Sequence, residues 1–238
     1  MAAEEESFLT HLEALRTMLL KSLLALALGI IPLFFVAPYC LDTLIRYIIG
    51  DNQVTLNYFM PMEVFLLQIK TALVLDLLIC FPYIARQVWL FLLPALYENE
   101  RRFIKSIVLI SSSLFIIGVL FCLFFILPML VNFGLSFSTP EIKAVWGISG
   151  IMNLALWLSV VFGLMFQFPL ITYSLIRSRI VSYDAVKNKR PYIFTGILII
   201  TGILTPPDIA SQLMLTIPTY LLFEAGLWAA RSSSKTQD

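Results

Sequence analysis

Glu98 and Glu100 lie beside Arg101 and Arg102, in a short polar stretch between two long apolar segments. Cations alone are enough to orient a loop at a membrane surface. Carboxylates at this rim can therefore bind an incoming cation, and arginine is the partner they hold best, through paired charge-assisted hydrogen bonds. The pattern predicts a site for a cationic segment that arrives from the water. The acids can instead pair internally with Arg101, Arg102 or Lys105, and the residues alone leave both interpretations open.

A second charged motif precedes the first apolar segment, where His11, Glu13 and Arg16 lie within two turns of a predicted helix. It adds one carboxylate and one arginine, so Glu13 and Arg16 are further candidates for the binding site. The alternative is an interfacial helix in which Arg16 anchors the chain at the membrane surface and His11 is an ordinary surface residue.

Three polar side chains fall inside apolar segments: Asp76, Gln167 and Glu224. A charge at bilayer depth costs about 2.5–3.5 kcal/mol on insertion scales, so these groups are expected to face the bundle interior or water, or to be protonated. They suggest a proton relay or a hydrated path. Alternatively, Gln167 bridges helices and Glu224 pairs with Arg231 or lipid head groups. Asp76 has no basic residue within one helical turn.

The composition is that of a membrane protein. The chain has 238 residues, of which 60% are hydrophobic and 13% charged, and its mean hydropathy is +0.91. A soluble domain carries about 25% charged residues. The net charge of +1 gives no reason to expect a nucleic-acid partner. The acidic N-terminus and the long first apolar run do not resemble a cleavable signal peptide.

Six apolar segments predict an all-α integral membrane protein with six transmembrane helices in one domain, residues 1–238. Residues 1–17 are predicted to form an amphipathic leader in the membrane interface, because apolar residues recur there at helical spacing. Pro128 is expected to end the third helix. The predicted spans are 18–38, 64–93, 103–127, 151–176, 192–204 and 209–230.

The fifth segment, 192–204, is short. As a helix it rises about 20 Å, against a hydrocarbon core of about 30 Å. Pro206 and Pro207 stop it, and Asp208 is placed to cap the next helix. Such a hairpin is expected to thin the membrane locally, unless the helix extends back toward Lys187.

Lysines and arginines are distributed unevenly between the two ends of the spans. Of the 16 in the chain, only Arg46, Lys70 and Lys143 flank one side. The positive-inside rule therefore predicts that both termini are cytosolic and that the loops 39–63 and 128–150 face outward.

No constellation for catalysis, a metal or a cofactor is visible. The chain has one histidine, no zinc-protease motif, no nucleophile elbow and no phosphate-binding glycine loop. Cys40, Cys80 and Cys122 lie in or beside apolar runs without paired spacing, and are predicted to be small packing residues rather than disulfides or ligands. We expect no enzyme activity and no cofactor.

Several blocks of sequence are longer and more specific than these patterns. They are FLTHLEALR at 8–16, EVF at 63–65 with Lys70, QVWLFLLPALY at 87–97 followed by ERR at 100–102, FGLMFQFP at 162–169, KRPY at 189–192, LTPPDIASQ at 204–212 and FEAG at 223–226. Together these blocks, which cover nearly the whole chain, resemble TatC, the multispanning receptor of the twin-arginine protein translocase.

The resemblance implies a curved, cup-like bundle of six helices, with the fifth and sixth short. It implies binding of twin-arginine signal peptides on the cytosolic face, and assembly with single-span TatA-like and TatB-like subunits and with further copies of the same chain. It also implies export of folded proteins across the bacterial inner membrane, driven by the proton-motive force.

Carried over by position, the resemblance makes Glu100 the carboxylate for the arginine pair, with Phe91 in the surface around it. Arg16 matches the family's N-terminal arginine, Gln167 a polar position facing the inside of the cup, and Asp208 the aspartate of the outer hairpin.

Three acidic residues depart from the family pattern. The family often has its N-terminal carboxylate where this chain has Ala14, and Glu13 is about 100° around the helix from it. Glu98 is a helper or a bystander of Glu100, and Asp76 has no family role.

Two other classes of function remain as alternatives. A proton-coupled transporter would use Asp76, Gln167 and Glu224, although the sequence shows no inverted repeat and no pair of glycine-interrupted helices. A scaffold without a ligand of its own would keep the acids at the membrane rim paired internally.

Overall fold

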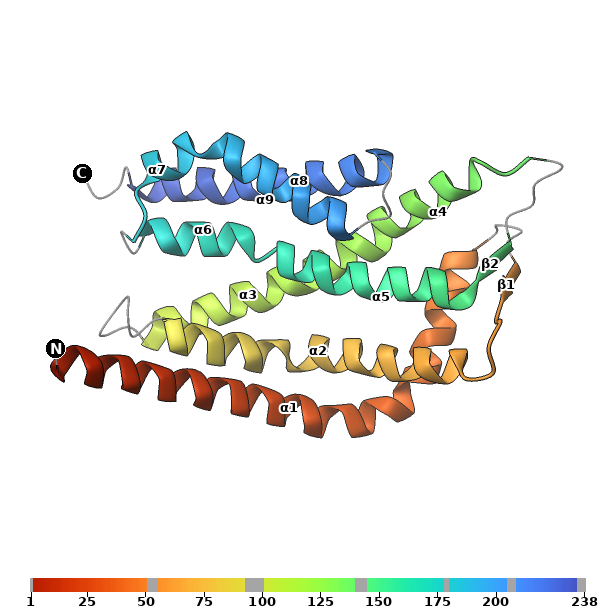
Figure 1. Cartoon of the computed structure of the whole chain (residues 1–238), viewed down its shortest axis with the longest axis horizontal. Coiled ribbons are helices and arrows are strands. Elements are labelled where there is room, and N and C mark those ends of the chain that lie inside the picture. The colour runs from red at the N-terminus through yellow and green to blue at the C-terminus, as the bar shows by residue number, and fades with distance from the viewer. Residues whose placement is uncertain are drawn as a thin grey trace. The chain divides into compact units, whose positions relative to one another are not determined.

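The computed structural model describes residues 2–50, 55–92, 101–139, 145–177, 180–204 and 209–234, and nearly all of these are helical (Figure 1). The predicted all-α integral membrane fold is confirmed, because the described residues include five helical stretches long and apolar enough to cross a membrane. A shorter apolar helix, Arg190–Ile203, accompanies them. The five stretches are His11–Ile49, Glu63–Leu92, Lys105–Leu135, Ile148–Arg177 and Gln212–Arg231.

The chain divides into two compact units. The first comprises residues 1–47 and 58–113, and the second comprises 48–57 and 114–238. The first unit is built on helices α1 (Ala2–Ile49) and α2 (Glu63–Leu92), which lie side by side. Their apolar runs are long enough to form helices that satisfy every backbone hydrogen bond internally, as a bilayer requires.

Helix α1 is longer than the span predicted at its position. The predicted interfacial leader is not a separate helix, because no glycine or proline interrupts the chain before Gly29. The helix also continues past the predicted end of the span at Pro38, and it changes direction in the half that contains Pro32 and Pro38 (Figure 1). It ends at Gly50, whose φ of 47° is the left-handed conformation that terminates helices.

The third predicted helix does not end at Pro128, which corrects the sequence analysis. Helix α3 (Arg101–Phe121) passes through a π-helical turn, Cys122–Ile126, into α4 (Leu127–Leu135). In the wide turn the N–H of Leu127 reaches back to the carbonyl of Cys122. Pro128 then occupies the first turn of α4, where a missing N–H is tolerated.

The fourth predicted span is two helices, α5 (Ile148–Met165) and α6 (Phe168–Arg177). A turn at Phe166 and Gln167 separates them. Pro169, which cannot donate a helical hydrogen bond, is the second residue of α6. A short helix α7 (Tyr183–Asn188) follows, capped by the Ser182 hydroxyl, which accepts from the N–H of Ala185 at 3.3 Å.

The last two helices are α8 (Arg190–Leu204) and α9 (Ile209–Ser234). Helix α8 has 15 residues, a rise of about 22 Å, and it does not join α7, because Lys189 leaves helical geometry. The fifth helix is therefore short, as predicted. Helix α9 has 26 residues, which is longer than expected, so the shortness is confined to α8.

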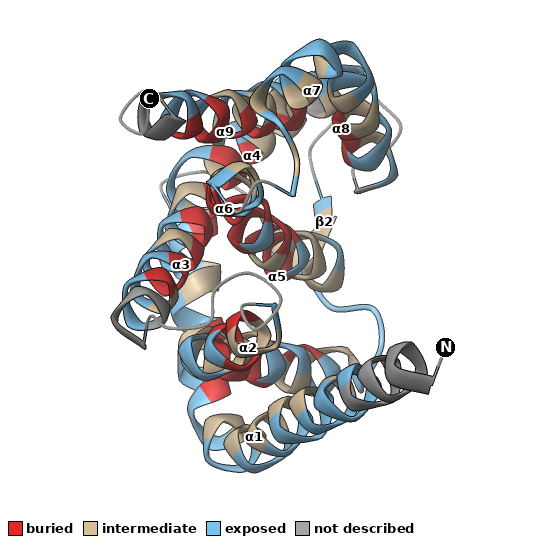
Figure 2. Ribbon diagram, turned by 90° about the vertical axis from the view of Figure 1, so that its left-hand side faces the viewer, coloured by how far each residue is buried: buried red, intermediate tan, exposed pale blue. Residues whose placement is uncertain are grey.

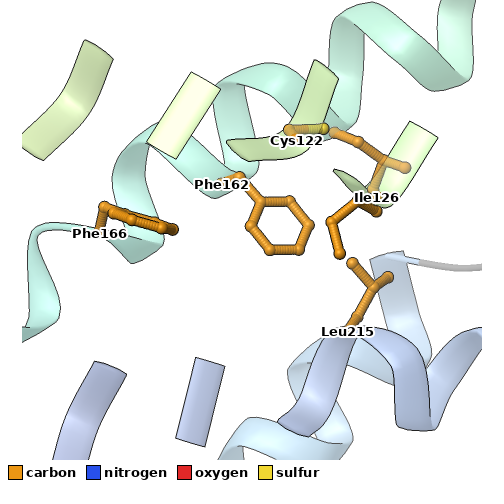
Figure 3. Close-up of a cluster of buried hydrophobic side chains, with 6 residues drawn as sticks. Cys122, Ile126, Phe162, Phe166 and Leu215 are labelled. Carbon is orange, nitrogen blue, oxygen red and sulfur yellow. The ribbon is translucent and has the colours of Figure 1, made fainter. Parts of the chain in front are cut away.

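Nine of the 18 residues of α5 are buried (Figure 2), and α2, α3 and α9 contribute further buried residues. Helices α6 and α9 pack closely, and the backbone of Pro169 comes so near to Gly226 that a side chain there would not fit. An apolar cluster from the π-helical turn, α5, the turn after α5, and α9 fills the second unit (Figure 3). Its buried members are Cys122, Ile126, Leu158, Phe162, Phe166 and Leu215.

A two-stranded sheet was not predicted. Strand β1 (Thr55–Asn57) pairs in parallel with β2 (Val145–Gly147), in the register Leu56 to Trp146. Strands of three residues are too short to show the alternation by which a strand is recognised in a sequence.

Candidate functional site

One end of the α1–α2 pair brings together two of the sequence motifs. The ring of His11, near the start of α1, stacks on the ring of Phe91, near the end of α2, with centroids 4.4 Å apart and an interplanar angle of 25°. The N-terminal motif therefore lies beside the part of α2 that leads into the predicted binding loop. Sequence analysis named Phe91 but gave His11 no role, because a contact between residues so distant in sequence leaves no local pattern.

Glu13 and Arg16 are exposed on α1. With His11 turned toward α2, Glu13 lies about 200° around the helix from it and Arg16 about 140°. Ala14 is only about 60° away from His11 by the same geometry. By this helix geometry Glu13 is on the opposite side of α1 from His11, whereas the position of Ala14 is close to it.

Five other candidates lie outside the described residues. They are the two acids of the predicted binding loop and the three residues of the predicted outer hairpin: Glu98, Glu100, Pro206, Pro207 and Asp208.

Asp76 is completely buried in α2, in the first unit. The Cys80 thiol, one turn further along the helix, donates to Asp76 Oδ1 at 3.3 Å. Asp76 Oδ2 is also buried and has no hydrogen-bond partner among the described residues. On α1, Gly29 packs against the carboxyl group, and a Cβ atom there would overlap Asp76 Oδ1. Gly29 and Cys80 are site residues that sequence analysis did not find.

Glu224 is differently placed. Its Oε2 lies 2.7 Å from the guanidinium of Arg190, and its Oε1 accepts from the Tyr220 hydroxyl at 2.8 Å. The side chains of Arg190 and Glu224 are 38% and 28% exposed. The ion pair is with Arg190, on α8, whereas the alternative for Glu224 named Arg231. Sequence spacing could not show this, since the antiparallel packing of α8 and α9 creates the pair.

Gln167 lies in the turn between α5 and α6 and is 8% exposed. Its side-chain nitrogen donates to the carbonyl oxygen of Gly163 at 3.5 Å. The contact is local and belongs to the helix break before Pro169.

The described residues contain no cluster of three or more histidine, cysteine or acidic side chains that could hold a metal ion. The fold defines a multispanning, largely helical membrane protein. Its described polar sites are the buried Asp76, the ion pair of Glu224 with Arg190, and the stack of His11 on Phe91.

The family model described as "Sec-independent protein translocase protein (TatC)" matches residues 10–218, and the chain belongs to this family. The Sec-independent protein translocase protein TatC of Haemophilus influenzae is 32% identical over 236 residues, which cover 96% of this chain and 90% of the relative. The protein of that name from Escherichia coli K12 is 32% identical over 97% of this chain and 91% of its own.

A solved structure, "Crystal Structure of Twin Arginine Translocase Receptor- TatC", superposes with a TM-score of 0.86 at 29% identity, over 94% of this chain and 99% of the other. The chain is therefore a component of the Sec-independent protein translocase and a multi-pass protein of the bacterial inner membrane. The resemblance stated from the sequence is confirmed.

Proposed function

We propose that this chain is the receptor subunit that binds twin-arginine signal peptides, and that it exports folded proteins together with single-span TatA-like and TatB-like subunits, using the proton-motive force. The observation that carries the proposal is the stack of His11 on Phe91. It joins the N-terminal motif to the helix end that leads into the predicted binding loop. Family membership and the printed name of the solved relative support the same conclusion.

The chemistry of the site is recognition of two guanidinium groups by carboxylates. Glu100 is the principal acceptor in this proposal and Glu98 a helper, with the stacked rings of Phe91 and His11 forming an aromatic wall. A carboxylate binds arginine through two parallel hydrogen bonds, which the point charge of lysine cannot reproduce. Glu13 contributes less than Glu100, because α1 turns it away from Phe91. Arg16 anchors the start of α1 at the membrane surface.

The direction of approach follows from the distribution of basic residues. Most lysines and arginines flank the ends of the spans that carry the N-terminus and the 93–100 segment. By the positive-inside rule this face and both termini are cytosolic, which is the side from which an exported protein arrives.

The short α8 supports a second element of the proposal. Its rise of about 22 Å is less than the hydrocarbon core of about 30 Å, so lipid beside it is expected to be compressed. A thinner bilayer would ease the passage of a folded cargo. Neutron or simulation data that show ordinary lipid thickness next to residues 190–212 would contradict this element.

The transporter alternative needs Asp76, Gln167 and Glu224 as open polar groups, and one of them, Glu224, is not open. Glu224 is engaged by Arg190 and Tyr220, so it is not an open polar group facing a path.

The test is binding of a twin-arginine signal peptide and a twin-lysine peptide to the purified chain in lipid nanodiscs. Loss of one charged hydrogen bond weakens binding by about 1.5–3 kcal/mol, which is roughly 10- to 150-fold. We expect that loss for the twin-lysine peptide and for Glu100→Gln. Asp184→Asn is the matched control, because it removes one exposed acid from α7, which lies on the same predicted face. Equal binding of both peptides by all three proteins would overturn the proposal.

A further inference from the structure

An apolar pocket of about 320 Å³ opens between α4 and α5, within the second unit, and strand β2 forms part of its wall. The helical residues that line it are Leu127, Leu130 and Val131 on α4, and Gly150, Ile151 and Leu154 on α5. None of the described lining residues is charged. The volume is at the lower end of those in which proteins bind small ligands, about 300–1,000 Å³, and the wall suits an apolar one.

The pocket exists because α4 and α5 diverge. At the π-helical turn, Cys122 and Ile126 belong to the same buried cluster as Leu158 and Phe162 of α5. Beyond the turn, α4 leads away from α5 (Figure 1). Side chains on the facing sides of the two helices therefore lack the close packing that is usual in a protein interior. The attraction lost in this way is regained only if another apolar group fills the space.

Gly150 leaves this space open on the side of α5. It is exposed, and nothing lies within 4 Å of a Cβ atom built at this position. A larger residue here would extend into the pocket without meeting another side chain. Gly150 is thus the position at which the pocket can be filled from within the chain.

The indole ring of Trp146 closes part of the pocket on the side of β2. It reaches α4, where a Cβ atom at Gly134 would lie 3.3 Å from the ring. The pairing of the two strands positions this residue, since Trp146 lies opposite Leu56 of β1. In membrane proteins, tryptophan is concentrated at the level where the acyl chains meet the head groups. The ring therefore indicates that the pocket begins at this level and continues into the hydrocarbon.

The helices that line the pocket are parts of membrane spans. Helix α4 ends the apolar stretch Lys105–Leu135, and the lining residues of α5 begin the stretch Ile148–Arg177. Acyl chains are the most abundant apolar molecules at this depth. One turn of a partner helix, about 5.4 Å long and about 10–12 Å wide with its side chains, is larger than the pocket. Water does not fill a cavity with an apolar lining.

We propose that the pocket binds one acyl chain of a phospholipid. The lipid comes from the leaflet on the side of β1 and β2, which the positive-inside rule predicts to be the outer one. Its chain lies between Leu130 of α4 and Ile151 and Leu154 of α5, and its head group stays at the level of Trp146. The bound chain replaces the packing that α4 and α5 lack. The proposal rests on the chain being a multi-pass membrane protein and not on its binding of signal peptides.

The test is quenching of Trp146 fluorescence by phosphatidylcholine that carries bromine on its acyl chains. The full chain has four tryptophans, and Trp89, Trp157 and Trp228 are replaced by phenylalanine so that Trp146 alone is observed. Each protein is placed in nanodiscs with an increasing brominated fraction, and its emission is divided by that in unbrominated lipid. One bound chain should give quenching in proportion to the brominated fraction.

A second protein retains Trp228 as its only tryptophan. This residue is 75% exposed on α9, so several lipids surround it and its quenching should rise more steeply at low brominated fractions. A curve for Trp146 as steep as that for Trp228 would mean ordinary lipid contact and would overturn the proposal.

Filling the pocket gives the decisive comparison. Gly150→Phe should remove most of the quenching of Trp146, Gly150→Leu should remove part of it, and neither should alter that of Trp228. Gly196→Phe on α8 is the matched control, because a Cβ atom there also meets nothing within 4 Å. Circular dichroism verifies that each variant is folded, and Gly150→Leu is the milder change if Gly150→Phe is not.

Two results would overturn the proposal. Quenching of Trp146 that both Gly150 variants leave unchanged would show that lipid reaches the ring without entering the pocket. Absence of quenching in the parent protein would show that no acyl chain is bound. In that case emission at long wavelength would indicate water in the pocket, and emission at short wavelength would indicate a segment of the protein itself. No peptide is present, so these outcomes are separate from those of the peptide-binding test.

Discussion

Asp76 and Glu224 are both carboxylic acids within apolar helices, yet their surroundings are opposite. Glu224 keeps 28% of its side chain exposed and is paired with Arg190 at 2.7 Å and with the Tyr220 hydroxyl at 2.8 Å. Asp76 is completely buried and has one weak thiol donor. The first acid is held by two strong polar partners, whereas the second is enclosed by the backbone of α1 at Gly29.

The comparison shows two ways in which an apolar helix can accommodate an acidic side chain. One is a partner brought by another helix, here α8, which makes the acid a structural element. The other is a close-packed helix backbone that covers the acid, as α1 does at Gly29. The two acids look alike in the sequence, and only the neighbouring helix separates them.

The largest effect is expected from filling the space beside Asp76. Gly29→Ala places a Cβ atom against the carboxyl group, and overpacking of this kind costs about 1–3 kcal/mol. Gly196→Ala is the matched control, because nothing lies within 4 Å of a Cβ atom at that position in α8. Unfolding in detergent, followed by circular dichroism, should show a loss for the first variant only. Adding Asp76→Ala to Gly29→Ala should recover part of it, and equal losses in both glycine variants would contradict the close packing.

A smaller effect is expected from removing the partner of Glu224. Arg190→Gln leaves the acid unpaired and only partly solvated. A fully buried unpaired charge costs about 3–5 kcal/mol, but the exposure of both side chains reduces this toward the value for surface pairs, about 1 kcal/mol. We expect a loss of about 1–2 kcal/mol in the same unfolding measurement. The double variant Arg190→Gln with Glu224→Gln should be more stable than Arg190→Gln alone. A double variant that is less stable would show that the pair is not what holds Glu224.

The sequence predicted the class of fold because apolar runs determine helices in a membrane directly. It identified the family because the loop and hairpin blocks are long. It misplaced the end at Pro128, since a π-helical turn before a proline has no local signature. It also found Asp76 and Glu224 but not the residues that contact them from other helices, Gly29 and Arg190. Contacts between helices depend on packing, which spacing within one segment does not encode. The predicted roles of Glu98 and Glu100 stay predictions.

The smallest change in unfolding free energy is expected when each acid in turn is replaced by its amide. Glu224→Gln removes a charge from an established ion pair, so we expect a loss of about 0.5–1 kcal/mol of unfolding free energy. Asp76→Asn keeps the shape of the side chain and a carbonyl oxygen that can still accept from the Cys80 thiol, so its loss should be smaller, within about 0.5 kcal/mol. The measurement is the unfolding free energy of wild type and both variants in detergent. A loss for Asp76→Asn that is larger than the loss for Glu224→Gln would contradict this contrast between the two acids.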